Sequence, residues 1–243
     1  MKDLKNKWAL ITGANRGLGY RISKFMAKHG VNLVLHSRSL EHTKSVYAEV
    51  KAMGVDAYCV AAELSKPDEI NRMVDEIKKN VKQIDIVFNN AAVQVAYRTD
   101  YFVTPVTDFM DSFMINTIAP MMLSYAFLPD MKKRGFGRII NTTSGIINEP
   151  EQAGYSASKA ALDKVTKDLG FTVEGTDVMI NLVDPGWCRT DLGGPKAPND
   201  PDSVIPGMVL GAFADDCKSG RWISAQEYAG MSLEDALVKF QTN

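Results

Sequence analysis

The alternation of short apolar runs with helical stretches is the feature that most constrains the fold of this 243-residue chain. The first apolar run, WALIT at residues 8–12, precedes a glycine-containing turn, a helical stretch over 20–29 and a second run, VNLVLH at 31–36. Further strand-like runs occupy 56–62, 84–88, 138–142 and 178–183, and further helical stretches occupy 40–53, 67–80, 106–133 and 151–169. This order predicts an α/β fold, a Rossmann-like doubly wound parallel sheet of about seven strands with helices on both faces.

The chain is expected to form one domain over residues 1–243, because no linker, repeat or charge block divides it. Pro120 and Pro129 should bend or interrupt the helical stretch 106–133. Residues 193–206, GGPKAPNDPDSVIP, are dense in glycine and proline and predict a loop. Because loops of this length in compact domains are usually functional, we expect a substrate loop at about 191–206.

The charge and cysteine content exclude several classes of protein. The 28 basic and 29 acidic residues give a formal charge of -1, so no field of one sign points to nucleic acid or to a membrane surface. The three cysteines and three histidines show no spacing typical of a disulfide framework or a metal site. The N-terminus enters a strand directly, and no apolar run reaches the roughly 18 residues that span a bilayer. A cytoplasmic location is therefore expected.

The turn TGANRGLG follows the first buried strand and opens the first helix. Glycines there let the backbone approach a pyrophosphate, and the N–H groups at the helix N-terminus face the anion. Ordinary strand-to-helix turns also use glycine, but the position of this one favours dinucleotide binding. The candidate phosphate-binding residues are Gly13, Asn15, Arg16, Gly17, Leu18 and Gly19.

The end of the second strand bears on the choice between NAD and NADP. Proteins that bind the ribose 2′-hydroxyl of NAD usually place an Asp or Glu there, whereas this chain has Ser37 and Arg38. Together with Arg16 in the glycine turn, Arg38 offers guanidinium groups that suit a 2′-phosphate. The alternative is a pair of solvated surface arginines. We therefore expect NADP(H) to be preferred over NAD(H).

Tyr155 and Lys159 are four residues apart, so on a helix they share one face. A phenol has an unperturbed pKa near about 10, and an adjacent ammonium group would lower it. The pair would then exchange protons with a substrate, and the hydroxyls of Thr142, Thr143 or Ser144 would supply a substrate hydrogen bond. The same spacing is also common on ordinary helix surfaces, so the pair alone does not establish catalysis.

The motifs TGxxxGxG, Asn89-Asn90-Ala91, Asn116, Ser144, Tyr155-xxx-Lys159 and Pro185-Gly186 occur in this order along the chain. As an ordered set over nearly the whole sequence, they closely resemble the short-chain dehydrogenase/reductase family. The resemblance implies an NADP(H)-dependent oxidoreductase that interconverts a ketone or aldehyde and an alcohol, with a small-molecule substrate. It also implies a homodimer or homotetramer, with subunit contacts through the long helical stretch and 151–170.

The resemblance also implies a role for each motif residue. Tyr155 is the general acid or base, Lys159 holds the nicotinamide ribose and lowers the phenol pKa, Ser144 orients the carbonyl group, and Asn116 connects Lys159 to solvent through a water. By the same likeness, Asn90 and Ala91 contact the adenosine side of the cofactor. The residues around the nicotinamide are Pro185, Gly186, Cys188 and Thr190.

Four departures from the family pattern leave questions open. Ala92 stands where the family has glycine. Glu63-Leu64 stands where an Asp usually precedes an apolar residue, and the Glu63 carboxylate would reach the adenine amino group. Counting from the strand selects Ser144 as the catalytic hydroxyl, whereas counting back from Tyr155 selects Thr142; we favour Ser144. The C-terminal segment matches no familiar substrate-binding ending.

The sequence does not identify the substrate. Tyr97, Tyr101 and Phe102 would either line its pocket or cover the sheet edge. Two other functions stay open: an epimerase or dehydratase with the same fold, and a non-enzymatic regulator that senses nucleotide. The presence of Ser144, Tyr155, Lys159 and Asn116 together argues against the regulator.

Overall fold

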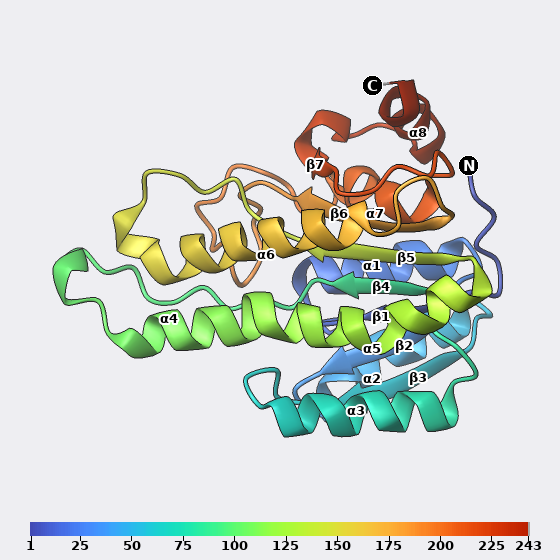
Figure 1. The fold of residues 1–243 in the computed structure, drawn as a ribbon, viewed down its shortest axis with the longest axis horizontal. Helices are drawn as coiled ribbons and strands as arrows, with labels where there is room; N and C mark the ends of the chain where they lie inside the picture. The colour runs from blue at the N-terminus through green and yellow to red at the C-terminus, as the bar shows by residue number, and fades with distance from the viewer. Residues whose placement is uncertain (243) are drawn as a thin grey trace.

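The computed structural model describes residues 1–242 and contains one seven-stranded parallel sheet in the order β3-β2-β1-β4-β5-β6-β7 (Figure 1). The strands are β1 (Trp8–Ile11), β2 (Asn32–Ser37), β3 (Ala57–Ala61), β4 (Ile86–Asn89), β5 (Gly137–Thr142), β6 (Val178–Asp184) and β7 (Trp222–Ser224). The helices are α1 (Gly17–Lys28), α2 (Leu40–Ala52), α3 (Pro67–Asn80), α4 (Val106–Phe113), α5 (Ala119–Arg134), α6 (Ala153–Phe171), α7 (Ile205–Phe213) and α8 (Leu233–Thr242). The predicted fold class is confirmed.

The sheet is buried on both faces because alternate residues of each strand enter two different cores. Ile11 of β1 packs in the core that also receives residues of α1, α2, α7 and α8. Its neighbour Leu10 packs in the core that receives residues of α3 and α5. Burial on both faces explains why the central strands appear in the sequence as continuous apolar runs rather than alternating ones.

The helical stretch predicted over 106–133 is divided by a π-helical turn, η2 (Met114–Ile118), between α4 and α5. Pro120 lies at the start of α5, where a missing N–H costs little. Pro129 lies inside α5, which continues to Arg134, so Pro129 does not interrupt the helix. The helical stretch is therefore interrupted only at η2, before Pro120, and not at Pro129.

The C-terminal segment that the sequence left without an interpretation completes the sheet. Its three-residue strand β7 pairs with β6, and α8 packs on α7. None of the helices within residues 1–242 is long and apolar enough to cross a membrane.

The order of the strands also fixes where a ligand would bind. Chain connections run outward in opposite directions from β1, so β1 and β4 form the switch point of the sheet. In doubly wound sheets the ligand crevice lies at this point, beyond the carboxyl ends of the strands. The glycine turn after β1 and the loops after β4, β5 and β6 all lie at that edge.

Candidate active site

The glycine turn is closely packed, and two of its glycines have left-handed backbone. The φ angles of Gly13 and Gly17 are 67° and 57°. A Cβ on Gly19 would lie 2.1 Å from the carbonyl oxygen of Gly13, so no other residue fits there without a shift. Asn15 and Arg16 precede α1, whose first turn contains Leu18, and no acidic residue stands in that turn. The free N–H groups there suit an anion.

Asn90 and Ala91 pack directly against this turn. The side-chain nitrogen of Asn90 donates to the Thr12 carbonyl oxygen at 3.0 Å, and a Cβ on Gly13 would lie 3.2 Å from the Ala91 Cα. The turn after β1 and the loop after β4 are thus held together across the switch point.

His36 is a buried contributor to the turn that the sequence did not reveal. Its Nδ1 accepts a hydrogen bond from the Gly13 N–H at 3.3 Å, and its Nε2 donates to the Ala62 carbonyl oxygen at 3.1 Å. Burial lowers the pKa of His36 to about 4, so the ring is neutral and can both accept and donate. A histidine in an otherwise apolar buried strand was the only available signal.

The two predicted arginines lie near the carboxyl ends of β1 and β2. Arg38 is exposed directly after β2, and Ser37 is buried with its hydroxyl donating to Ser39. Arg16 forms an ion pair with Asp191 at 3.1 Å, a partner that was not expected.

Beyond β3, Leu64 is buried, and the Glu63 carboxylate accepts the Ser65 N–H at 3.3 Å. The Glu63 side chain is therefore engaged locally, within its own loop.

Tyr155 and Lys159 lie side by side near the start of α6, with 9% and 2% of their surfaces exposed. The Lys159 Nζ donates to the Thr142 carbonyl oxygen at 2.7 Å and lies 5.8 Å from the centroid of the Tyr155 ring. The Ser144 hydroxyl lies close enough to the Tyr155 phenol to act on its pKa. The structure thus brings Ser144, Tyr155 and Lys159 together.

A close helix contact positions Tyr155. A Cβ on the preceding residue, Gly154, would lie 2.8 Å from the Asp108 carbonyl oxygen of α4. The backbones of α4 and α6 therefore touch immediately beside the phenol-bearing residue, and only glycine permits this separation.

Burial decides the protonation of the pair. It raises the pKa of Tyr155, while the neighbouring Ser144 hydroxyl acts in the opposite direction. It also lowers the pKa of Lys159 to about 8. The expected lowering of the phenol pKa by Lys159 is not seen, because burial of the phenol dominates.

Asn116 lies in the π-helical turn between α4 and α5, and its side chain bonds to the loop after β4 and to α6. Its side chain exchanges two hydrogen bonds of 2.9 Å with the backbone of Val93, in the loop after β4. Its amide nitrogen also donates to the Ser158 hydroxyl at 3.0 Å. Asn116 is thus fixed beside Ser158 of α6, the residue that directly precedes Lys159.

Two carboxylates near Lys159 were missed by the sequence reasoning. Asp163 accepts the Thr143 hydroxyl, and Asp184 accepts the N–H groups of Gly186 and Gly145 at 2.9 and 3.1 Å. Both carboxylates raise the pKa of Lys159 against the effect of burial. Asp163 stands four residues after Lys159, a spacing that was available in the sequence; Asp184 gave no comparable signal.

The loop after β6 crosses the glycine turn. Thr190 packs on Gly17, where a Cβ would lie 3.6 Å away. Cys188 is buried, its thiol donates to the Pro185 carbonyl oxygen, and burial raises its pKa to about 11, so it is unreactive at neutral pH.

The predicted substrate loop is folded back on its neighbours. Arg21 of α1 binds Asp202 through two hydrogen bonds of 2.8 and 3.1 Å. Asn199 donates to the Trp187 carbonyl oxygen at 2.9 Å, which closes the loop on the segment after β6.

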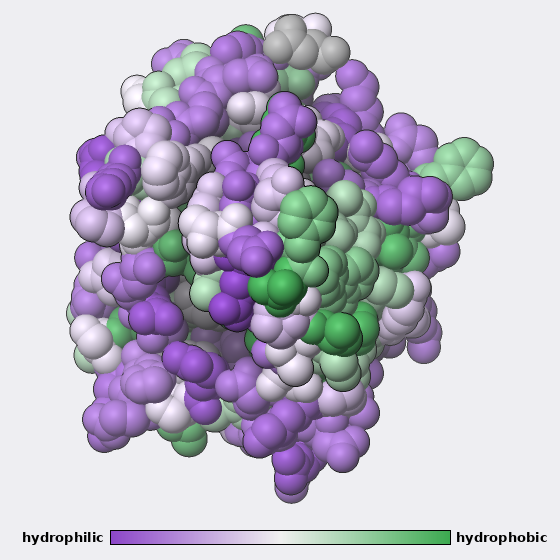
Figure 2. All heavy atoms as spheres, turned by 90° about the vertical axis from the view of Figure 1, so that its left-hand side faces the viewer, coloured by the Kyte–Doolittle hydropathy of each residue, from purple (hydrophilic) through white to green (hydrophobic). Residues whose placement is uncertain are grey.

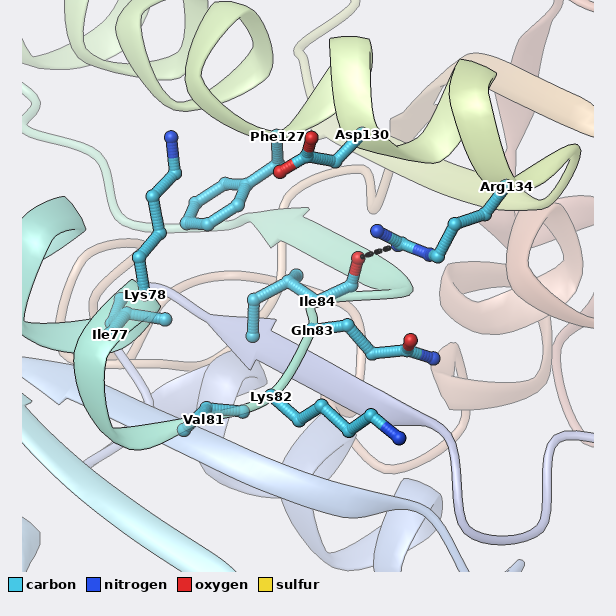
Figure 3. A pocket seen from close by; sticks show the side chains of 9 residues that line it. All are labelled: Ile77, Lys78, Val81, Lys82, Gln83, Ile84, Phe127, Asp130 and Arg134. Atoms are coloured by element: carbon cyan, nitrogen blue, oxygen red, sulfur yellow. Dashed lines mark hydrogen bonds between the residues drawn. The ribbon is translucent and has the colours of Figure 1, made fainter.

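A pocket of about 180 Å³ lies away from these residues (Figure 3). It is lined by residues of α3 and α5, and Arg134 donates to the Ile84 carbonyl oxygen at 2.7 Å. Ile84 precedes β4, so this pocket lies at the amino edge of the sheet, opposite the site.

The glycine turn and the buried Tyr–Lys pair at the carboxyl edge define a dinucleotide-dependent oxidoreductase. A family model described as short chain dehydrogenase matches residues 7–201. The chain therefore belongs to the short-chain dehydrogenase/reductase family, whose enzymes depend on NAD(P).

The similar proteins include curated relatives and solved structures. The oxidoreductase UcpA of Salmonella typhimurium is 32% identical over 217 residues, covering 86% of this chain and 81% of the relative. The 3-oxoacyl-[acyl-carrier-protein] reductase FabG of Staphylococcus epidermidis is 28% identical over 216 residues, covering 87% of each chain. A metagenomic short-chain oxidoreductase in complex with NADP has a TM-score of 0.80 and 28% identity, covering 92% of this chain and 98% of its own.

Proposed function

We propose that this protein is an NADP(H)-dependent oxidoreductase that interconverts a ketone or aldehyde and the corresponding alcohol by hydride transfer. The observation that carries the proposal is the buried Tyr155–Lys159 pair with the Ser144 hydroxyl beside the phenol. The nicotinamide cofactor supplies the hydride when bound, and the chain supplies position and protons.

The residues around the turn fit a dinucleotide phosphate. A side chain on Gly19 is excluded, and the N-terminus of α1 carries no competing acid. Arg38 is exposed, and the Arg16–Asp191 pair is weak because both side chains are more than half exposed. Both guanidiniums are therefore free to bind a 2′-phosphate, which supports NADP(H) over NAD(H). The other proposed contacts are Asn15, Gly17, Leu18, Ser37, Glu63, Leu64, Asn90, Ala91, Pro185, Gly186, Cys188 and Thr190.

Tyr155 is assigned as the proton donor during reduction and the acceptor during oxidation. Its raised pKa keeps the phenol protonated at neutral pH, the state in which it can donate to a carbonyl oxygen. Ser144 is assigned to orient the carbonyl. The effect of its hydroxyl on the phenol pKa supports it over Thr142, whose carbonyl oxygen binds Lys159. Lys159 would hold the ribose hydroxyls, and Asn116 would order a water that connects Lys159 to solvent.

The test is NADPH oxidation with a panel of neutral ketones and aldehydes. Tyr155→Phe should lower kcat by about 10²- to 10⁴-fold, the usual contribution of a positioned proton donor, with NADPH affinity unchanged. Arg38→Asp should reduce the preference for NADPH over NADH. If no ketone or aldehyde of the panel is reduced, and Tyr155→Phe keeps its full biological function, the nucleotide-sensing regulator is favoured instead.

We propose that the protein forms a homodimer or homotetramer whose subunits contact one another through α5 and α6, the helices in front of the sheet in Figure 1. Tyr125 of α5 and Phe171 of α6 are 53% and 84% exposed on these helices. Light scattering after size exclusion should give at least twice the 26.7 kDa chain mass. The cytoplasmic location stays a prediction.

A further inference from the structure

We propose that the carbonyl substrate of this site is apolar and carries no negative charge. The inference rests on the proposed function and narrows its substrate class. It follows from the side chains that the loops after β4, β5 and β6 present around Ser144 and Tyr155.

Hydrogen bonds hold these three loops together beside the reacting groups. The side-chain nitrogen of Gln152 donates to the Val95 carbonyl oxygen at 3.0 Å, and the Arg98 N–H donates to the Glu151 carbonyl oxygen at 3.1 Å. These bonds join the loop after β4 to the segment that leads into Tyr155. Asp184 joins the loop after β6 to Gly145, next to Ser144. The loops therefore form one rim around the site.

Each loop exposes a large apolar or aromatic side chain on this rim. Tyr97, Ile147 and Trp187 are 59%, 73% and 57% exposed and come from the loops after β4, β5 and β6. Phe102 and Val103 extend the surface. Figure 2 looks onto the face at the left of Figure 1, toward which the strand arrows point, and shows hydrophobic residues gathered over one part of it.

The charged groups on the same loops are predominantly acidic. Residues 93–104, 144–152 and 184–192 contain five carboxylates and two guanidiniums. Both guanidiniums are already engaged: Arg98 binds Asp108 through hydrogen bonds of 2.8 and 3.1 Å, and Arg189 donates to the carbonyl oxygens of Ala197 and Pro198. Neither guanidinium of these segments is therefore left to pair with an anionic substrate; the exposed Lys196 lies further along the loop after β6, followed by Asp200 and Asp202.

The two ends of the crevice therefore differ in charge. Arg16 and Arg38 lie at the cofactor end, where Asp191 pairs with Arg16, and Asp100, Glu149 and Glu151 lie with the exposed apolar side chains at the substrate end. A substrate anion at this rim would lose hydration and meet like charges, both of which cost free energy. A neutral apolar substrate gains from the exposed side chains instead.

Two thioesters with the same reacting ketone test this inference. Acetoacetyl-N-acetylcysteamine is neutral, whereas acetoacetyl-CoA is anionic through its phosphates. With saturating NADPH, kcat/KM for the neutral thioester should be at least about tenfold higher. Rising ionic strength should raise kcat/KM for the anion only, because salt screens the repulsion between exposed charges.

A charge reversal separates the effect of charge from that of size. Glu149→Lys should raise kcat/KM for acetoacetyl-CoA several-fold and leave the neutral thioester within twofold. The matched control is Glu234→Lys on α8, an exposed position outside the rim, which should change neither. Equal or faster turnover of the CoA thioester by the unaltered protein would overturn the inference alone. Absence of turnover with every carbonyl compound, including the neutral panel, would overturn the proposed function and the inference together.

Discussion

Asp184 shows how a single carboxylate acts on both the geometry and the protonation of the site. It accepts hydrogen bonds from the loops after β5 and β6, and its charge raises the pKa of both Tyr155 and Lys159. We therefore regard it as a positioning residue that also favours the protonated phenol.

Asp184→Asn separates these two effects. The amide can still accept from the Gly186 N–H, but the negative charge is lost, so the pKa of Tyr155 should fall. The alkaline limb of kcat for carbonyl reduction should then move to lower pH by about half a unit to one unit, since a nearby charge shifts a pKa by this order. The pH profile of kcat measures the shift, and Asp111→Asn, an exposed site on α4, is the charge-matched control. A fall in kcat without movement of the limb would mean that Asp184 is structural only.

His36 makes folding stability depend on pH. Its folded-state pKa of about 4 lies below the unfolded value of 6.5, so the unfolded chain binds the extra proton first as pH falls. The stabilisation is fully present above about pH 6.5 and is lost toward pH 4. From pH 7 to pH 5, the free energy of unfolding should fall by about 2 kcal/mol through this group.

Denaturant unfolding of His36→Asn and of the original protein at both pH values checks this dependence. The variant should lose the His36 share of the pH effect, whereas His42→Asn, at an exposed position on α2, should retain it. The same pH dependence in His36→Asn as in the original protein would contradict the assignment.

The glycine turn and the start of α1 depend on a single residue, Gly19. Gly19→Ala would place a Cβ 2.1 Å from the Gly13 carbonyl oxygen, so the turn must open. We expect a loss of about 1–3 kcal/mol in unfolding free energy, as for other overpacked sites, together with a large loss of NADPH affinity.

Gly211→Ala provides the matched control for this change. Gly211 also lies in a helix, α7, but its Cβ would lie 3.4 Å from the nearest atom, an ordinary contact. That variant should retain stability and NADPH binding. Thermal unfolding and NADPH fluorescence titration compare the two variants, and equal behaviour would contradict the packing argument.

The regular elements were predictable because strands buried on both faces leave continuous apolar runs between helical ones. The π-helical turn was not, because it accompanies contacts of Asn116 with Val93 and Ser158, 23 and 42 residues away. Ser144, Tyr155 and Lys159 were found by spacing and family likeness. The bonds of Asp184 were not, because they join loops that are separate in sequence.

At the scale of the whole molecule, the sheet separates two charge environments along one edge. Strand order places β1 and β2 on one side of the switch point and β5 and β6 on the other. Arg16 and Arg38 follow the first pair, whereas Glu149 and Glu151 follow β5, and Asp191, which reaches back to Arg16, follows β6. The sequence could not show this separation, because the overall charge of -1 averages over both ends.

The close approach of Gly154 to Asp108 has a consequence for how this gene tolerates mutation. Every missense change at codon 154 adds at least a Cβ where only 2.8 Å is available to a backbone oxygen. No conservative replacement exists, and each change must part α4 from α6 beside the phenol. One of the least mutable positions near Tyr155 is therefore a residue that contributes no functional group at all.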